Sequence, residues 1–201
     1  MVSVPLWLPE GLTPDGLVLA GGSGRRLGRP KAGIVIEGST LVERAVAMLA
    51  CRCADVVVVS RADVPLPPLD VRVVLDAQGP NGPMNALATG LGALAAEEVV
   101  VLACDLPLAA PMLDRLLAEP AQVASVAFDG VRIQPLCARY PRVATLQAAR
   151  TLMAKGAFRM TELAAALDAV TVSAQALELL NVNRTEDLDQ ITRLLLEVTK
   201  S

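Results

Sequence analysis

Uninterrupted aliphatic runs are the feature that most constrains the fold of this chain. Three of them occur at Leu17–Ala20, Ala54–Ser60 and Glu98–Cys104, and a further strand is predicted at Val71–Leu75, where Arg72 interrupts the run. Runs without polar alternation are typical of strands that are covered on both faces, as in parallel sheets. Helical patterns lie at about 40–51, 84–96 and 111–118. This alternation predicts an α/β fold with a Rossmann-like, doubly wound, mostly parallel sheet in a three-layer α/β/α arrangement.

Two later apolar runs interrupt the alternation. Residues 122–128 and 131–139 flank Asp129-Gly130, a dipeptide that favours hairpin turns, so we expect a hairpin insertion in the C-terminal part. A last helix is predicted from about Thr185 to Val198, because acidic residues occupy its first turn. The length suits one domain, with an N-terminal extension at 1–15, a part for a first ligand at 16–110 and a part for a second at 111–201.

The composition excludes several classes of protein. A formal net charge of −3 argues against a nucleic-acid partner, which needs an extended basic face. No apolar run approaches the ~20 residues that span a membrane. The first residues lack the basic segment of a secretory signal, so we expect a cytoplasmic protein.

The histidine and cysteine content limits the available chemistry. The chain contains no histidine, which removes histidine triads and histidine metal sites. The cysteines lack the spacing of a metal site or a disulfide framework, so buried, reduced thiols are expected at Cys51, Cys53, Cys104 and Cys137. Any reaction must therefore use carboxylates, cations, backbone N–H groups and a bound metal.

A glycine-rich, cationic loop follows the first strand. It reads LAGGSGRRLGRPK over residues 19–31 and carries Arg25, Arg26, Arg29 and Lys31. Glycines let backbone N–H groups turn toward an anion, and the cations supply charge-assisted hydrogen bonds to phosphate oxygens. The spacing fits neither the P-loop nor the dinucleotide fingerprint. We interpret the loop as a polyphosphate-binding element; the alternative is a surface turn with solvated arginines.

Polar residues also stand at the ends of the later strands, where ligands bind in parallel sheets. Asp105 directly follows a buried strand and has no cation beside it in the sequence. A structural ion pair is therefore not expected, and ligation of Mg²⁺ next to a polyphosphate suits this carboxylate better. The alternative for Asp105 is a cap on the following helix. Asp76 suits a ligand contact or an ordinary turn equally well.

Together these motifs resemble the molybdenum cofactor guanylyltransferases, nucleotidyltransferases with a Rossmann-like sheet. The loop matches L-A-G-G-x-x-x-R-M-G-x-x-K, and the stretch from Asp76 to Gly82-Pro83 matches D-x-x-x-x-x-G-P. The sequences VVVLACDLP and NVNRTEDL, the second at 181–188, match the family's metal and C-terminal motifs. The resemblance implies transfer of GMP from Mg-GTP to the terminal phosphate of molybdopterin, with release of pyrophosphate.

The resemblance also implies roles for individual residues. Catalysis would use Arg26, Lys31 and Asp105, with Asp105 as the Mg²⁺ ligand. The nucleotide would contact Leu19, Ala20, Gly21, Gly22, Lys31, Ser60, Asp76 and Asp105. The acceptor or metal side would include Asn181 and Asn183, unless these amides only satisfy their own loop. GTP and molybdopterin are the expected ligands, with transient contacts to other proteins of cofactor biosynthesis; the oligomeric state is left open.

Two departures from the family pattern concern the base or acceptor pocket. Asn85 stands where the family has a small residue, and Gln134 stands where histidine is frequent. Three alternatives stay open: the same reaction with CTP, nucleotidyl transfer to another phosphorylated small molecule, and a catalytically silent nucleotide-binding regulator. Retention of the loop, Lys31 and Asp105 together argues against the regulator.

Overall fold

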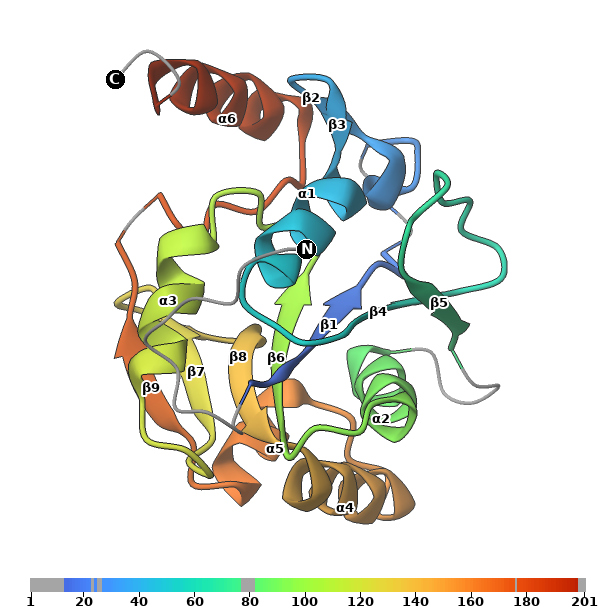
Figure 1. Ribbon diagram of the computed structural model, residues 1–201, viewed down its shortest axis with the longest axis vertical. Coiled ribbons are helices and arrows are strands. Elements are labelled where there is room, and N and C mark those ends of the chain that lie inside the picture. Colours follow the sequence, from blue (N-terminus) through green and yellow to red (C-terminus); the bar gives the residue numbers. More distant parts are fainter. Residues whose placement is uncertain (1–12, 23, 25–26, 77–81, 176, 199–201) are drawn as a thin grey trace.

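A computed structural model describes residues 13–22, 24, 27–76, 82–175 and 177–198 as a three-layer α/β/α domain (Figure 1). The strands are β1 (Asp15–Leu19), β2 (Val35–Ile36), β3 (Ser39–Thr40), β4 (Val56–Ser60), β5 (Arg72–Leu75), β6 (Glu98–Ala103), β7 (Ser125–Phe128), β8 (Ile133–Pro141) and β9 (Val170–Ser173). The helices are α1 (Leu41–Ala50), α2 (Pro83–Ala93), α3 (Ala110–Ala118), α4 (Arg142–Ala154), α5 (Met160–Ala166) and α6 (Thr185–Val198), with a 3₁₀ turn at Lys31–Gly33.

The main sheet has seven strands in the order β5-β4-β1-β6-β8-β7-β9. The strands β5, β4, β1 and β6 are parallel, whereas β8 is antiparallel to both β6 and β7. The chain leaves β1 toward β4 and later returns to β6 on the other side of β1. The strand order therefore reverses between β1 and β6, and this switch point is where a doubly wound sheet binds its ligand.

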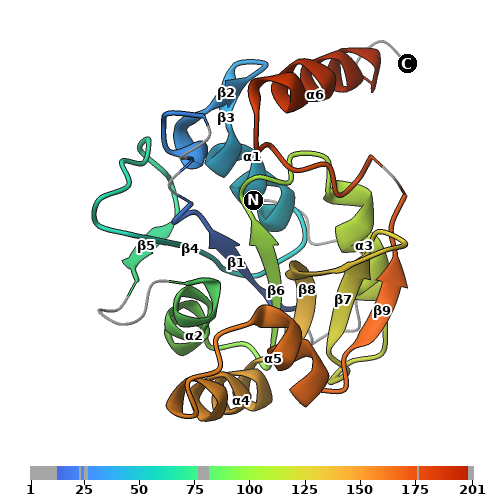
Figure 2. The same cartoon turned by 180° about the vertical axis from the view of Figure 1, so that it is seen from behind.

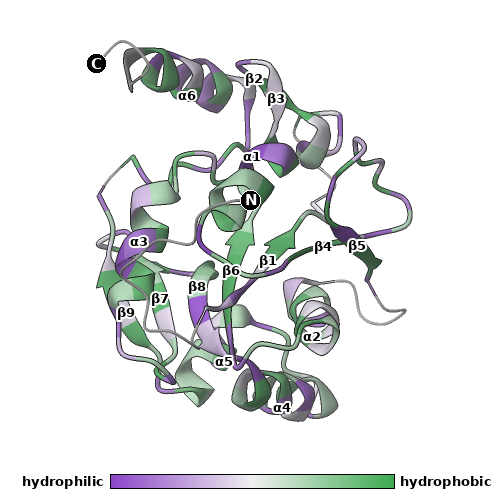
Figure 3. Ribbon diagram, viewed as in Figure 1, coloured by the Kyte–Doolittle hydropathy of each residue, from purple (hydrophilic) through white to green (hydrophobic). Residues whose placement is uncertain are grey.

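Alternate residues of the central strands pack into two separate hydrophobic cores, one on each face of the sheet. Val18 and Val58 pack with α1 and α3 on one face, whereas Leu17 and Val57 pack with α2, α4 and α5 on the other. Figure 2 shows the helices on the two faces from behind, and Figure 3 shows that the central strands are hydrophobic. The prediction of strands buried on both faces is confirmed for β1, β4 and β6. It is wrong for β5, which lies at the edge of the sheet with Val73 and Leu75 exposed.

The first strand begins two residues before the predicted Leu17. Asp15 belongs to β1 although it is charged and only 5% exposed. Its carboxylate accepts hydrogen bonds from the backbone N–H groups of Ala95 (3.0 Å) and Ala96 (2.9 Å), which explains how a buried charge is tolerated there. Most of the proposed N-terminal extension lies outside the described residues.

The predicted hairpin is present, and it forms part of the main sheet. Its strands β7 and β8 pair through Phe128 and Ile133, and β8 also pairs with β6. The sequence patterns did not predict the helices α4 and α5. They also did not predict β9, which pairs with β7 in parallel and completes the far edge of the sheet.

Helix α6 lies beside the small sheet β2-β3 in both views (Figures 1 and 2). Ile191 of α6 packs there with Ile34 and Val182 in a third hydrophobic cluster. Within the described part of the chain, no helix has the length and apolar character needed to cross a membrane.

The four cysteines are free thiols. Cys53, Cys104 and Cys137 are buried as predicted, but Cys51 is exposed because it lies at the end of α1, beyond the face that packs on the sheet.

Candidate functional site

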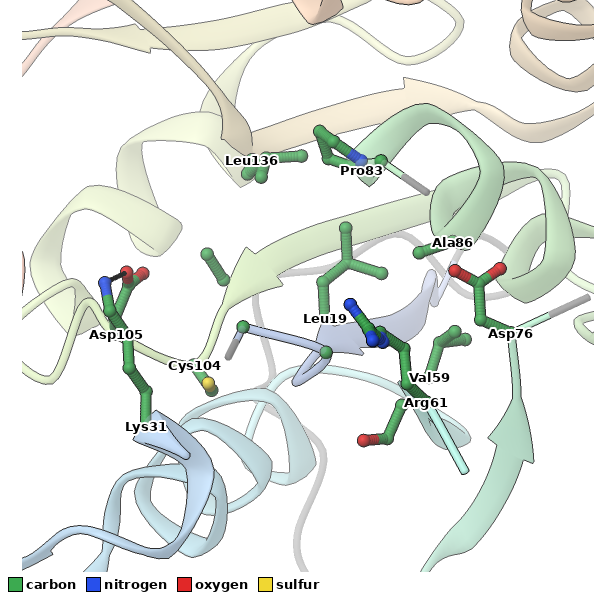
Figure 4. A pocket seen from close by; sticks show the side chains of 15 residues that line it. Leu19, Lys31, Val59, Arg61, Asp76, Pro83, Ala86, Cys104, Asp105 and Leu136 are labelled. Carbon is green, nitrogen blue, oxygen red and sulfur yellow. Dashed lines mark hydrogen bonds and ion pairs between the residues drawn. The ribbon is translucent and has the colours of Figure 1, made fainter. Parts of the chain in front are cut away.

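A pocket of about 380 Å³ opens beyond the carboxyl ends of β1, β4, β5 and β6, at the switch point of the sheet (Figure 4). Lys31 and Asp105 lie on one side of it, and Asp76 lies on the other. The pocket is lined by Leu19, Gly21, Gly22, Lys31, Val59, Ser60, Arg61, Asp76, Gly82, Pro83, Ala86, Ala103, Cys104, Asp105 and Leu136. All but Leu136 come from the part of the chain before residue 110.

The glycine-rich loop turns back on itself before Lys31. The backbone N–H of Lys31 lies 3.4 Å from the carbonyl oxygen of Gly22. Gly24 has a φ of +56°, and a Cβ atom at this position would collide with the carbonyl oxygen of Arg29, so only glycine fits. Arg29 itself is exposed. The predicted catalytic residue Arg26 lies outside the described residues.

Lys31 joins two residues that are far away in the sequence. Its Nζ donates hydrogen bonds to Asp105 Oδ2 and to Asn183 Oδ1, both at 2.6 Å. The expectation that Asp105 would have no ion-pair partner was therefore wrong, because the fold brings in a lysine from 74 residues away. The capping alternative is not supported either: the N-cap of α3 is Ala109, and it has no side-chain cap hydrogen bond in the described structure.

The segment before α6 holds Asn183 in this position. The backbone N–H of Val182 donates to the carbonyl oxygen of Asp105 at 2.9 Å. Asp187, in the first turn of α6, accepts hydrogen bonds from the backbone N–H groups of Asn183 and Arg184, both at 2.8 Å. Asn181 differs from Asn183: its amide donates to the carbonyl oxygen of Leu179, as the loop-satisfying alternative predicted.

The opposite end of the pocket is lined by the carboxylate of Asp76 and the buried hydroxyl of Ser60, whereas Asn85 contacts Asp76 without lining the pocket itself. The backbone N–H of Asp76 donates to the carbonyl oxygen of Ser60 at 2.7 Å. Asn85 Nδ2 and Thr89 Oγ1 donate to Asp76 Oδ1 at 2.8 and 3.4 Å. Ser60 is 1% exposed, and its Oγ has no hydrogen-bond partner among the described residues. Buried polar atoms are normally satisfied, so this hydroxyl is suited to a ligand.

The structure gathers most of the residues that the sequence singled out. Among the predicted nucleotide contacts, those that line the pocket are Leu19, Gly21, Gly22, Lys31, Ser60, Asp76 and Asp105. Ala20 is fully buried in the core behind the pocket. Gln134 lies on β8 and donates to Asp129 at 3.3 Å instead of lining the pocket.

Sequence reasoning missed several lining residues. Arg61 follows Ser60 at the end of β4, and its guanidinium pairs with the carboxylate of Asp63 at 2.6 and 2.8 Å. Because Arg61 directly follows the end of a predicted strand, its position could have indicated that it lines the pocket. Leu136 reaches the pocket from the hairpin, facing Pro83 (Figure 4). No local pattern predicts this approach, because it depends on how β8 joins the sheet.

The donor set at the Lys31 end fits a hard cation. It offers oxygen atoms from Asp105 and Asn183, and Mg²⁺ prefers one or two carboxylates together with substrate phosphates. No group of three or more histidine, cysteine or acidic residues placed to hold a metal occurs within the described ranges. Cys104 also lines the pocket, but burial raises the pKa of its thiol to about 12, so it stays protonated.

A pocket at the switch point of a doubly wound sheet is where α/β proteins bind nucleotides. Residues 16–170 match the model of the MobA-like NTP transferase domain. A probable molybdenum cofactor guanylyltransferase of Chloroflexus aggregans is 32% identical over 197 residues, covering 90% of this chain and 94% of its own. One of the same description from Mycobacterium tuberculosis is 36% identical over 190 residues, with the same coverage. The chain belongs to the MobA-like NTP transferase family.

A solved structure supports the fold independently. A nucleotidyl transferase from Methanothermobacter thermautotroptrophicus superposes with a TM-score of 0.76 at 22% identity, covering 94% of this chain and 100% of its own.

Proposed function

We propose that this protein transfers GMP from GTP to the terminal phosphate of molybdopterin and releases pyrophosphate. The observation that carries the proposal is the polarity of the pocket, with Lys31 and Asp105 at one end and Ser60 and Asp76 at the other. A nucleoside triphosphate matches this arrangement when its phosphates lie at the Lys31 end. The names of the relatives, probable molybdenum cofactor guanylyltransferases, support guanine and the acceptor.

The reaction needs no general base. An oxygen of the acceptor phosphate is already an anion; it attacks the α-phosphorus of GTP, and the bond to the pyrophosphate oxygen breaks. The obstacle is bringing two anions together. Lys31 and the backbone N–H groups of Gly21 and Gly22 would bind the phosphates. Mg²⁺, held by Asp105, would supply further positive charge to the leaving group. Holding donor and acceptor in line contributes about 7–11 kcal/mol to lowering the barrier.

Asn183 would act at the acceptor side of this centre, because it lies against Lys31. If nucleotide phosphates bound the ammonium group of Lys31, the side-chain oxygens of Asp105 and Asn183 would be available to hold Mg²⁺. We propose that Arg26, at the corresponding position of the family's loop motif, adds a second cation.

The proposed base specificity is tested by competition among nucleotides. GTP should bind at least about 10-fold more tightly than CTP or ATP in the presence of Mg²⁺, because the hydrogen-bonding groups of the other bases would not match Ser60 and Asp76. Calorimetry with the three nucleotides measures this preference. Equal or tighter binding of CTP would favour the cytidylyl alternative. Release of pyrophosphate in the presence of molybdopterin separates an enzyme from a silent regulator.

Lys31 and Arg29, the two cationic residues of the loop within the described ranges, should contribute differently to GTP binding. Lys31→Met should weaken GTP binding about 10-fold, because phosphate charge is left uncompensated in a partly buried site. Arg29→Met should change it less than about 2-fold, since an exposed charge is screened by salt. Titration of both variants at one ionic strength ranks them. A larger loss for Arg29→Met would show that the loop presents its other side to the nucleotide.

A further inference from the structure

Two side chains of α2 hold the carboxylate at the Asp76 end of the pocket. Asn85 and Thr89 lie one helical turn apart, so they share a face of α2, and both donate to the same oxygen, Asp76 Oδ1. A carboxylate only accepts hydrogen bonds, so the NH₂ group of Asn85 must be the side that faces it. At 2.8 Å, the contact of Asn85 is the shorter of the two. Of these two donors, Asn85 therefore makes the stronger hydrogen bond to Asp76.

These contacts come from a rigid element. Helix α2 buries Met84 and Leu87 on the sheet, and Gly90 packs so closely on Leu17 that a Cβ atom would collide with that side chain. The other side of Asp76 is also anchored, because its backbone N–H bonds to β4 at Ser60. The carboxylate is thus held by the helix while its backbone is held by the sheet.

We propose that Asn85 is a positioning residue, assisted by Thr89, that orients the Asp76 carboxylate toward the N1–H and the exocyclic amino group of guanine. This inference rests on the proposed function. Guanine presents two adjacent donors on this edge, which one carboxylate can accept together. Cytosine and adenine present a ring nitrogen acceptor beside a single amino group, so the same carboxylate meets a lone pair. Selectivity then depends on the angle of the carboxylate, and Asn85 sets that angle.

Inosine triphosphate tests this role, because it keeps N1–H and lacks the exocyclic amino group. We expect Asn85→Ala in the full chain to weaken GTP binding at least about 10-fold, to weaken inosine triphosphate binding much less, and so to narrow the preference between them. Thr89→Val should act in the same direction with a smaller effect. Gln147→Ala, which removes an exposed amide from α4, is the matched control and should leave both affinities unchanged. Thermal melting establishes that each variant is folded.

A charge variant gives a second, independent readout. In Asn85→Asp, the introduced carboxyl can donate to Asp76 while it is protonated, but it repels Asp76 once both are ionised. The preference for GTP over inosine triphosphate should therefore be larger at about pH 5 than at about pH 8, whereas the wild type should show no such change.

The outcomes separate this inference from the proposed function. A wild type that prefers CTP or ATP overturns both. A wild type that prefers GTP, together with an Asn85→Ala variant that weakens both purine triphosphates equally or weakens neither, overturns the role of Asn85 alone. A preference of Asn85→Asp that is independent of pH also overturns it, since a merely structural residue would give that result.

Discussion

Asp105→Asn should lower the rate of GMP transfer at least about 100-fold, which is the cost typical of losing one strong electrostatic contact in an active site. Asparagine keeps the shape of the side chain and removes the charge that the proposed mechanism assigns to the metal. It also leaves the ammonium of Lys31, 2.6 Å away, without its carboxylate partner. The fold should survive, because the backbone contact from Val182 to residue 105 does not involve the side chain.

Pyrophosphate release at limiting Mg²⁺ measures this effect. Asp114→Asn is the matched control, because Asp114 pairs with Arg52 on the surface and its side chain is 49% exposed. The control should keep the wild-type rate. If Asp105→Asn turned over as fast as the wild type at limiting Mg²⁺, the proposed metal role of Asp105 would be wrong, and its pairing with Lys31 would be structural.

Arg139→Met should destabilise the protein by about 3–5 kcal/mol, because it leaves the carboxylate of Glu98 buried without its charge partner. Glu98 on β6 and Arg139 on β8 form an ion pair whose side chains are 2% and 5% exposed. Arg139 also donates to the carbonyl oxygens of Leu117 and Glu119, at 3.2 and 2.7 Å, and so ties the end of α3 to the sheet. Arg139→Met removes both the ion pair with Glu98 and the hydrogen bonds to the end of α3.

Thermal and urea unfolding measure this loss, which corresponds to a fall in Tm of about 6–20 °C at the 2–4 °C per kcal/mol typical of this size. The double variant Glu98→Gln with Arg139→Met should be more stable than Arg139→Met alone, since it removes the uncompensated charge. Arg72→Met, which breaks an exposed pair with Asp55, should cost less than about 1 kcal/mol. A double variant as unstable as the single one would contradict the explanation.

Local patterns predicted the large elements up to β8 and the last helix α6, but not α4, α5, β9 or the short strands β2 and β3. The aliphatic runs predicted β1, β4, β5 and β6, although they placed the start of β1 two residues late. Asp15 caused that error, because its burial depends on N–H groups that lie 80 residues away. Asp129-Gly130 predicted the hairpin, but no pattern of that kind announced β9, whose outer positions are exposed at the edge of the sheet.

The sequence by itself determined the elements of the site: a glycine loop after β1, and polar residues where β4, β5 and β6 end. Their convergence also followed, because parallel strands bring their carboxyl ends to one edge of the sheet. Only the tertiary structure decided which side chains meet there. Lys31 pairs with Asp105 and Asn183 across 74 and 152 residues, and Asn85 reaches Asp76 from a helix. Such contacts depend on how whole helices and strands pack against each other. The spacing of residues along the chain does not contain that information.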